Sequence, residues 1–298
     1  MNKKAIFWLV VGFLIVIDGG LIVYQFVFNK PKADVVVKPN TVDIRQFNLL
    51  PTSNPNINAP LVNFANATNI YTPEANFFYA SPVLLKRDGD NLLFLARGQA
   101  SVKYDEIIYS KSSDLTDWTK PTVIKKFADQ KIVDLFGTRT TFGYYLFYIT
   151  QDQNQKYATN YLYSKDGTNW NEETINITTD NLIKGAAMQD QNSLRVILLD
   201  ADKRTVKQSF VDQKNIWTPL TVTIKLNLEI SDLDLFKSTD YYYLLFSSNN
   251  VLYETGSIDF HTFNQPQSIL TLKDNNFNLG NVGITTEISD GVYLNKNL

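Results

Sequence analysis

The sequence contains no cysteine and only one histidine, His261, among its 298 residues. Without cysteine there are no disulfides, no thiolate nucleophiles and no thiolate-ligated metals. A single histidine also argues against a Ser–His–Asp triad and against a metal site built from several histidines. We therefore expect no metal and no cofactor, and any hydrolytic chemistry would have to use carboxylates.

The sequence also lacks an excess of charge of either sign. Lysine and arginine number 28 against 30 aspartates and glutamates, and no basic block interrupts the pattern. Because nucleic-acid binding leaves a concentrated basic footprint, the charge pattern predicts no nucleic-acid partner.

One long hydrophobic run is present, and it lies near the N-terminus. Residues 5–28 carry a single charge, Asp18, and are long enough to cross the roughly 30 Å hydrocarbon core of a bilayer. A cleaved signal peptide is the alternative, but no small-x-small site follows. Lysines occur on both sides of the run, so the positive-inside rule does not decide the orientation. We expect a single-pass membrane protein with a short tail, residues 1–4, inside and the large domain outside the cytoplasm.

A proline-rich stretch follows this run. Five of the ten prolines fall between residues 29 and 60, and their fixed backbone geometry favours an extended chain over a long helix. We interpret residues 29–56 as a linker that holds the following domain clear of the bilayer.

Beyond the linker there is no long segment with helical spacing, while short β-branched and aromatic runs recur between turn signals. Five of these runs recur at intervals of 53, 51, 47 and 49 residues, which is close to the length of a four-stranded propeller blade. Their central residues are Leu93, Leu146, Ile197, Leu244 and Tyr293. The repeat predicts an all-β fold for residues 57–298, a five-bladed β-propeller.

A second repeat is a Ser-x-Asp sequence followed four residues later by an aromatic residue. It occurs at 112–118, 164–170 and 257–263, with a looser copy at 209–217. We interpret it as a structural turn, in which the aspartate accepts hydrogen bonds from turn amides and the aromatic ring packs between sheets. The residues assigned to this role are Asp114, Trp118, Asp166, Trp170, Asp259 and Phe263.

The last repeat has few residues after its marker, so we expect its blade to need outer strands from elsewhere. Residues 57–72 precede the first complete repeat and are predicted to pair with this blade. Such pairing would close the ring and remove exposed strand edges.

The repeat length and the aspartate turns resemble the five-bladed propellers of glycoside hydrolase families 43 and 32, and the turns resemble the Asp boxes of sialidases. The resemblance covers about residues 75–298. It implies three carboxylates on the innermost strands of the first three blades, serving as base, pKa modulator and acid. The positions twelve residues before the five markers are Ser81, Asp134, Gly185, Asp232 and Asn281. Only Asp134 retains one of the implied carboxylates, and serine and glycine can perform neither task of a glycosidase pair.

Several residues around the predicted channel are candidates for ligand binding, and we assign none of them a catalytic role. Asp134 could contact a ligand or bond backbone amides around the channel. Asp232 and Asp234 share a strand face that suits calcium, sugar hydroxyls or a solvated channel rim. Arg97 could hold an anionic sugar or form a surface pair. The candidates are Ser81, Arg97, Asp134, Asp232, Asp234 and Asn281.

Three hypotheses for function remain open. The first is a glycosidase-like propeller that has lost hydrolysis and binds carbohydrate or a cell-surface partner. The second is an active glycoside hydrolase with relocated acids, which leaves enzyme activity undecided. The third is a propeller whose ligand is another protein, since fold does not fix function.

Overall fold

The computed structural model describes residues 68–72, 74–99, 103–173, 175, 181–238, 241–271, 277–279, 284–287 and 291–294. All regular elements of this part are strands, as the sequence predicts. They are β1 (Thr68–Tyr71), β2 (Phe78–Arg87), β3 (Asp90–Gly98), β4 (Glu106–Ser112), β5 (Thr122–Lys126), β6 (Gln130–Thr140), β7 (Gly143–Asp152), β8 (Tyr157–Ser164), β9 (Asn171–Glu173), β10 (Leu182–Asp190), β11 (Ser193–Asp200), β12 (Thr205–Val211), β13 (Thr221–Lys225), β14 (Asp232–Ser238), β15 (Tyr241–Ser248), β16 (Val251–Ser257), β17 (Gln267–Thr271), β18 (Phe277–Leu279), β19 (Ile284–Glu287) and β20 (Gly291–Leu294).

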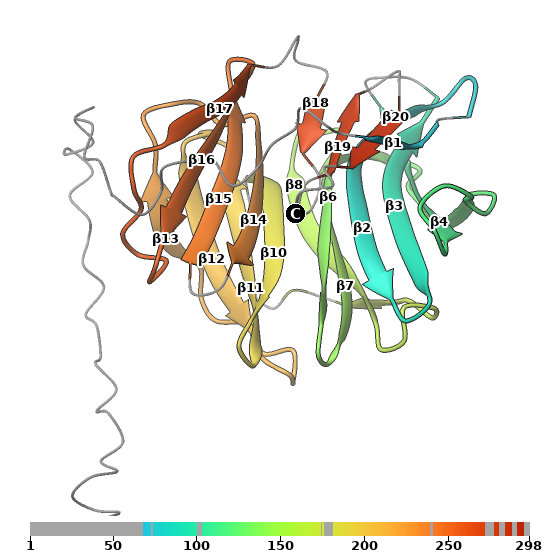
Figure 1. Ribbon diagram of the computed structural model, residues 1–298, viewed down its shortest axis with the longest axis horizontal. Coiled ribbons are helices and arrows are strands. Elements are labelled where there is room, and N and C mark those ends of the chain that lie inside the picture. The colour runs from blue at the N-terminus through green and yellow to red at the C-terminus, as the bar shows by residue number, and fades with distance from the viewer. Residues whose placement is uncertain are drawn as a thin grey trace, which may run out of the picture. The chain divides into compact units, whose positions relative to one another are not determined.

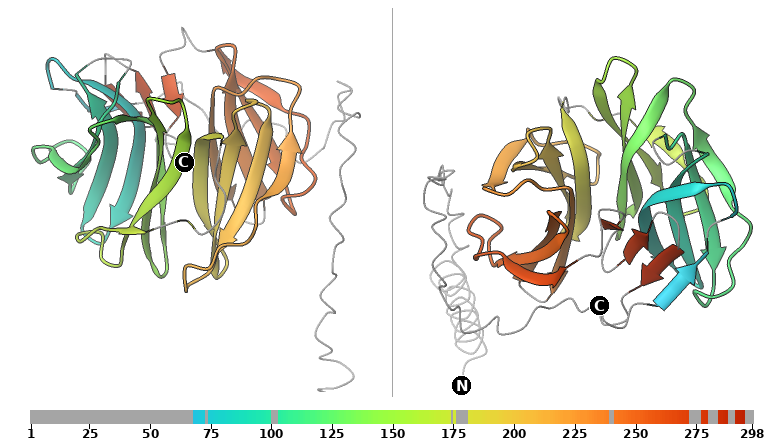
Figure 2. Two further views of the ribbon diagram at one scale, coloured as in Figure 1. Left: turned by 180° about the vertical axis from the view of Figure 1, so that it is seen from behind. Right: turned by 90° about the horizontal axis from the view of Figure 1, so that it is seen from above.

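Sixteen of these strands form four antiparallel meanders that follow one another along the chain (Figure 1). We call them blade I (β2–β5), blade II (β6–β9), blade III (β10–β13) and blade IV (β14–β17). The first strands of consecutive blades lie side by side, and the sheets are arranged around a common axis (Figure 2, right). This architecture is an all-β propeller.

A further four-stranded sheet combines the two ends of the domain, in the order β1-β20-β19-β18. β1 pairs antiparallel with β20, so residues 68–71 supply an outer strand, as predicted; residues 57–67 lie outside the described residues. The marker Tyr293 was assigned wrongly, because it lies on β20, next to the outer strand, whereas the other four markers lie on the second strand of their blades. The position counted back from it, Asn281, therefore does not correspond to the other four, and it lies outside the described residues.

The hydrophobic core consists of layers between neighbouring sheets. Successive side chains of a strand point to opposite faces, so β7 packs against both of its neighbours. Leu146 and Tyr148 pack with blade I residues such as Phe94, and Phe147 and Ile149 pack with blade III residues such as Val196. Because both faces of the second strands are covered, their sequences are continuous apolar runs rather than alternating ones.

The Ser-x-Asp repeats form the turns between the third and fourth strands of their blades. In the first turn, the Asp114 carboxylate accepts hydrogen bonds from the amides of Thr116 (2.9 Å) and Asp117 (3.0 Å). These bonds hold the pKa of Asp114 well below its usual range. Asp166 and Asp259 accept the equivalent amide bonds, and in Asp166 the pKa falls to about 2. The three aspartates therefore accept hydrogen bonds from the amides of their own turns.

The aromatic residue of each turn packs on the blade or sheet that precedes it. Trp118 contacts Tyr71 of β1, with ring centroids 6.1 Å apart, and its indole donates to the Ile70 carbonyl. Trp170 lies edge-on to Phe94 of blade I at 5.1 Å. Phe263 belongs to the core layer between blades III and IV. The turns thus join neighbouring sheets.

We expect Trp170→Ala to lower the free energy of unfolding by about 3 kcal/mol, because fully buried large-to-small changes cost about 3–5 kcal/mol and Trp170 is partly buried. Chemical denaturation of the full chain measures this loss. Ile258→Ala is the matched control, since Ile258 lies in the equivalent turn of blade IV and is 70% exposed. A Trp170 variant that melts like the wild type but loses ligand binding would show that the ring contacts ligand instead.

No helix among the described residues is long and apolar enough to cross a membrane. The predicted tail (1–4), transmembrane helix (5–28) and linker (29–56) lie outside the described residues.

Candidate functional site: a lysine-bridged cluster on the inner strands

Four of the positions selected from the sequence meet near the start of the inner strands. Ser81 lies on β2, Asp134 on β6, Gly185 on β10 and Asp232 on β14. The Ser81 hydroxyl donates to Asp134 Oδ1 at 3.1 Å, and the Gly185 amide donates to Asp134 Oδ2 at 2.8 Å. The repeat-based alignment therefore identifies neighbouring residues on separate blades.

Three of the inner strands have a β-bulge or a similar irregularity beside the residues of this cluster. The pairing register shifts between Ala80 and Val83 in β2, between Ile132 and Asp134 in β6, and between Leu182 and Lys184 in β10. Ser81 also has a positive φ of 48°, which is uncommon for a residue other than glycine. Bulges redirect side chains and occur often beside functional sites, and here they turn polar groups of three blades toward one another.

Lys184, which the sequence analysis missed, bridges the cluster. Its ammonium lies 3.1 Å from Asp134 Oδ1 and 3.4 Å from Asp232 Oδ1. Burial alone would lower the pKa of Lys184, but the two carboxylates outweigh burial and hold this pKa above its ordinary value. Lys184 is therefore a cation at neutral pH, and its charge joins carboxylates from blades II and IV.

Asp134 is almost fully enclosed, with 3% of its surface exposed. Burial raises its pKa above the ordinary value, although Lys184, the Gly185 amide and Ser81 all oppose the rise. Both carboxylate oxygens accept hydrogen bonds from the protein. Of the two alternatives given for Asp134, the structure shows a bond to backbone, from the Gly185 amide.

The position of Gly185 leaves no room for a side chain. A Cβ atom placed there would lie 2.3 Å from Cζ of Phe136, a separation that real Cβ atoms essentially never show. Phe136 is itself buried and stacks on Phe147 with ring centroids 5.0 Å apart. The resemblance implies an acid-bearing glutamate at this position, and in this chain an aromatic ring fills the space beside it.

The remaining sequence candidates differ in their surroundings. Asp234, two residues beyond Asp232 on β14, is buried and accepts a hydrogen bond from the Leu235 amide at 2.7 Å. Arg97 forms ion pairs with Glu106 at 2.6 Å and with Glu74 at 3.0 Å. Arg97 therefore already has two carboxylate partners in the part of the chain that the structure describes, Glu106 and Glu74.

Within the part of the chain that the structure describes, no group of three histidine, aspartate or glutamate side chains is arranged to hold a metal ion. Ser81, Asp134, Lys184 and Asp232 instead supply one hydroxyl, one ammonium and two carboxylates. These groups can donate and accept hydrogen bonds, as the recognition of hydroxyl-rich molecules requires.

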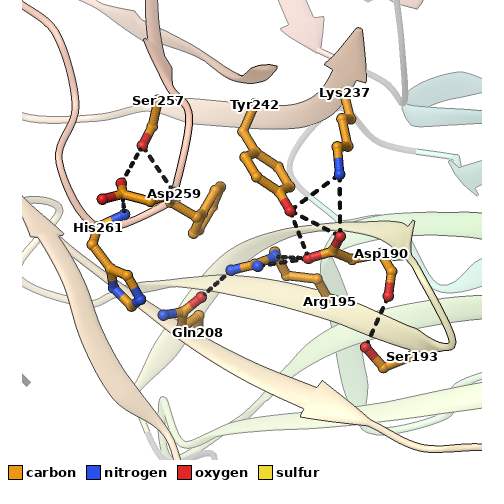
Figure 3. Close-up of polar contacts among 10 residues, drawn as sticks. Asp190, Ser193, Arg195, Gln208, Lys237, Tyr242, Ser257, Asp259 and His261 are labelled. Atoms are coloured by element: carbon orange, nitrogen blue, oxygen red, sulfur yellow. Dashed lines mark hydrogen bonds and ion pairs between the residues drawn. The ribbon is translucent and has the colours of Figure 1, made fainter. Parts of the chain in front are cut away.

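A second polar cluster lies at the opposite end of β10 and joins blades III and IV (Figure 3). Asp190 accepts bonds from Arg195 Nη2 at 2.6 Å and from the Tyr242 hydroxyl at 2.9 Å, and Lys237 lies 3.5 Å away. Burial opposes ionisation, but these donors keep the pKa of Asp190 below its usual range. The Arg195 guanidinium also lies 4.2 Å from the Phe260 ring centroid. Because Asp190 and Arg195 of blade III bond or contact Tyr242, Lys237 and Phe260 of the blade IV segment, we interpret this cluster as a connection between blades.

No known sequence family matches the chain, and no curated protein matches it. Solved structures do resemble it. An exo-β-1,3-galactanase of Phanerochaete chrysosporium aligns with a TM-score of 0.58 and 12% identity over 72% of this chain and 59% of that one. The GH43_1 enzyme of Xanthomonas citri aligns with a TM-score of 0.56 and 9% identity, over 72% and 81% of the two chains. A family 32 β-fructofuranosidase of Bombyx mori aligns with a TM-score of 0.54 and 14% identity, over 70% of this chain and 53% of that one. The chain thus has a β-propeller fold similar to that of glycoside hydrolases of families 43 and 32.

Proposed function

We propose that this chain is a glycoside hydrolase-like propeller that binds carbohydrate without hydrolysing it. The proposal rests on the hydrogen bonding of Asp134. Both of its carboxylate oxygens already accept hydrogen bonds from the protein, from Ser81, Lys184 and Gly185. Hydrolysis requires a proton donor and a base or nucleophile about 5 to 9.5 Å apart across the scissile bond. Ser81 and Gly185 supply neither group.

Binding is supported by the chemistry that remains and by the similar structures. The cluster contains a hydroxyl, an ammonium and two carboxylates, which are group types that bond sugar hydroxyls, and Lys184 is its most exposed charged group, with 14% of its side chain exposed. The Xanthomonas citri enzyme has been observed with xylose and with xylotriose. A protein or other surface partner is the competing ligand, and a glycan array distinguishes the two.

An active glycosidase with relocated acids is the second candidate, and one observation favours it. Asp134 and Asp232 both lie within 3.4 Å of the same ammonium, so their carboxylates are close enough to flank a glycosidic bond. The raised pKa of Asp134 is also the property of a general acid. Against this candidate, Lys184 lies where the scissile bond would have to pass.

We expect the full chain to cleave no arabinosyl, xylosyl, fructosyl or sialyl reporter substrate, and Asp134→Ala to weaken any glycan binding that an array detects. Melting curves establish that the variant folds, and Asp88→Ala is the control because the Asp88 side chain is 93% exposed. Hydrolysis by the wild type that disappears in Asp134→Asn or Asp232→Asn would establish the active enzyme instead.

We also propose that the propeller has five blades, that its turns are of the sialidase Asp-box type, and that residues 5–28 anchor it outside the cytoplasm. The position of β18 beside both β2 and β14 supports ring closure, and the shared amide bonds of Asp114, Asp166 and Asp259 support the turn type. The length and apolarity of residues 5–28 support the anchor. Protease digestion of intact cells tests the location, since an external propeller is degraded without lysis.

A further inference from the structure

A pocket of about 360 Å³ lies between blades I and II, away from the residues around Lys184. Blade I contributes the end of β5, and blade II contributes parts of β6, β7, β8 and β9, with the segment joining β5 to β6 between them. The volume lies within the range of small-molecule sites, roughly 300–1,000 Å³. The lining residues are Lys125, Lys126, Phe127, Ala128, Asp129, Gln130, Tyr148, Asn160 and Glu172.

One wall of this pocket is a fixed arrangement of charge and aromatic rings. Lys125 Nζ lies 2.6 Å from Glu172 Oε2, and the Tyr148 hydroxyl donates to the other oxygen of Glu172. The same ammonium lies 5.4 Å from the Phe127 ring centroid and 5.3 Å from that of Tyr148. Lys125 and the Tyr148 bond lower the pKa of Glu172, which keeps it ionised. The wall is therefore organised before a ligand arrives, which reduces the entropic cost of binding.

The cations of the pocket are already neutralised by the protein. Lys125 pairs with Glu172, and Lys126 pairs with Glu106 at 2.9 Å. An anionic ligand would have to compete with these carboxylates. A neutral ligand avoids that competition.

Three polar side chains of the lining remain available. Among the described residues, the side chains of Asp129, Gln130 and Asn160 have no hydrogen-bond or ion-pair partner. Asn160 lies opposite Tyr148 in the β7–β8 pair, and Gln130 begins β6. Two amides and one carboxylate provide both donors and acceptors, a combination that matches vicinal hydroxyl groups.

We propose that this pocket is a second saccharide site, specific for neutral sugars and separate from the cluster around Asp134. The proposal rests on the carbohydrate-binding function proposed above. It places one ligand at the inner strands and another between the outer parts of blades I and II.

Calorimetric titration of the full chain in detergent, with xylotriose and with β-1,3-galactotriose as probes, tests the proposal. We expect the wild type to bind one of the probes at two sites per chain. The Gln130→Ala/Asn160→Ala variant should lose the pocket site and retain the other site. Asp129→Ala should weaken binding at the pocket site at least tenfold. Asp129 is exposed, so its loss does not threaten folding. Gln213→Ala, at an exposed turn of blade III, is the matched control and should change nothing.

The outcomes separate the two proposals. If the wild type has two sites and both persist in the pocket variants, the proposal for the pocket is wrong and carbohydrate binding stands. The same conclusion follows if the wild type has a single site that is lost only in Asp134→Ala. A wild type that binds neither probe overturns the pocket and counts against carbohydrate binding at both sites. Tighter binding of galacturonate than of galactose at the pocket would contradict its assignment to neutral sugars.

Discussion

Deletion of residues 57–72 is expected to lower the melting temperature of the full chain by at least about 15 °C. The deletion removes β1, which pairs with β20, and it removes Ile70 and Tyr71, both 7% exposed and packed against blade I. Loss of a large buried side chain costs about 3–5 kcal/mol. The combined loss approaches the total stability of many domains, about 5–15 kcal/mol. Deletion also exposes the edge of β20, which favours aggregation.

A second deletion provides the control for this result. Removing residues 31–50, within the predicted linker, should change the melting temperature by no more than a few degrees. Calorimetry of the two deletion variants measures the difference. If both deletions have the same effect, β1 does not hold the sheet of β18–β20 in place, and the proposal of ring closure is wrong.

Replacement of Lys184 by methionine should lower the free energy of unfolding by about 3–5 kcal/mol at neutral pH, the usual cost of removing one partner from a buried ion pair. Methionine keeps much of the side-chain length but leaves Asp134 and Asp232 without the charge that joins them. Denaturant titration measures the loss. Lys126→Met is the matched control, because Lys126 is 67% exposed in its pair with Glu106 and exposed pairs contribute about 0–1 kcal/mol.

The Lys184 variant should also show a stronger pH dependence than the wild type, with the sign that the raised pKa of Asp134 already gives the wild type. Burial already raises the pKa of Asp134 above the roughly 3.9 of an unfolded aspartate, and loss of the ammonium removes the largest influence that opposes this rise. The folded state then binds more protons than the unfolded state, so stability rises as the pH falls from 7 toward about 5. A variant that is as stable as the wild type, or equally stable at both pH values, would show that the bridge is not needed.

Most of the fold can be predicted from the sequence because the second strand of each blade is a continuous apolar run that recurs at a regular interval. Leu93, Leu146, Ile197 and Leu244 each lie on such a strand, and these strands are buried on both faces. The final repeat could not be read in the same way. Its strands are only three or four residues long, and one strand comes from residues 68–71, so Tyr293 was matched to the wrong strand.

The candidate site could be predicted only in part. Counting back from the markers identifies Ser81, Asp134 and Asp232, since inner and second strands of similar length keep a similar offset. Lys184 was missed because a lysine beside a glycine in a strand is usually a solvated residue, and only the bulge in β10 turns it toward the carboxylates. The sequence likewise gives no sign that Phe136 fills the space beside Gly185, since their contact depends on how blades II and III pack.

The pairing of β1 with β20 also sets the order in which the domain can mature. On the ribosome, Thr68–Tyr71 emerge before the four meanders, and their partner Gly291–Leu294 emerges after them. Each meander joins strands that are neighbours in the sequence and can form early, whereas this final pairing closes a loop containing all of blades I to IV. The entropy cost of loop closure grows only slowly with length. The pairing of β1 with β20 is therefore delayed by the time needed to synthesise the intervening chain more than by its free-energy cost. Until Gly291–Leu294 emerge, Thr68–Tyr71 have no pairing partner, and a chaperone acting at that stage would protect this unpaired strand.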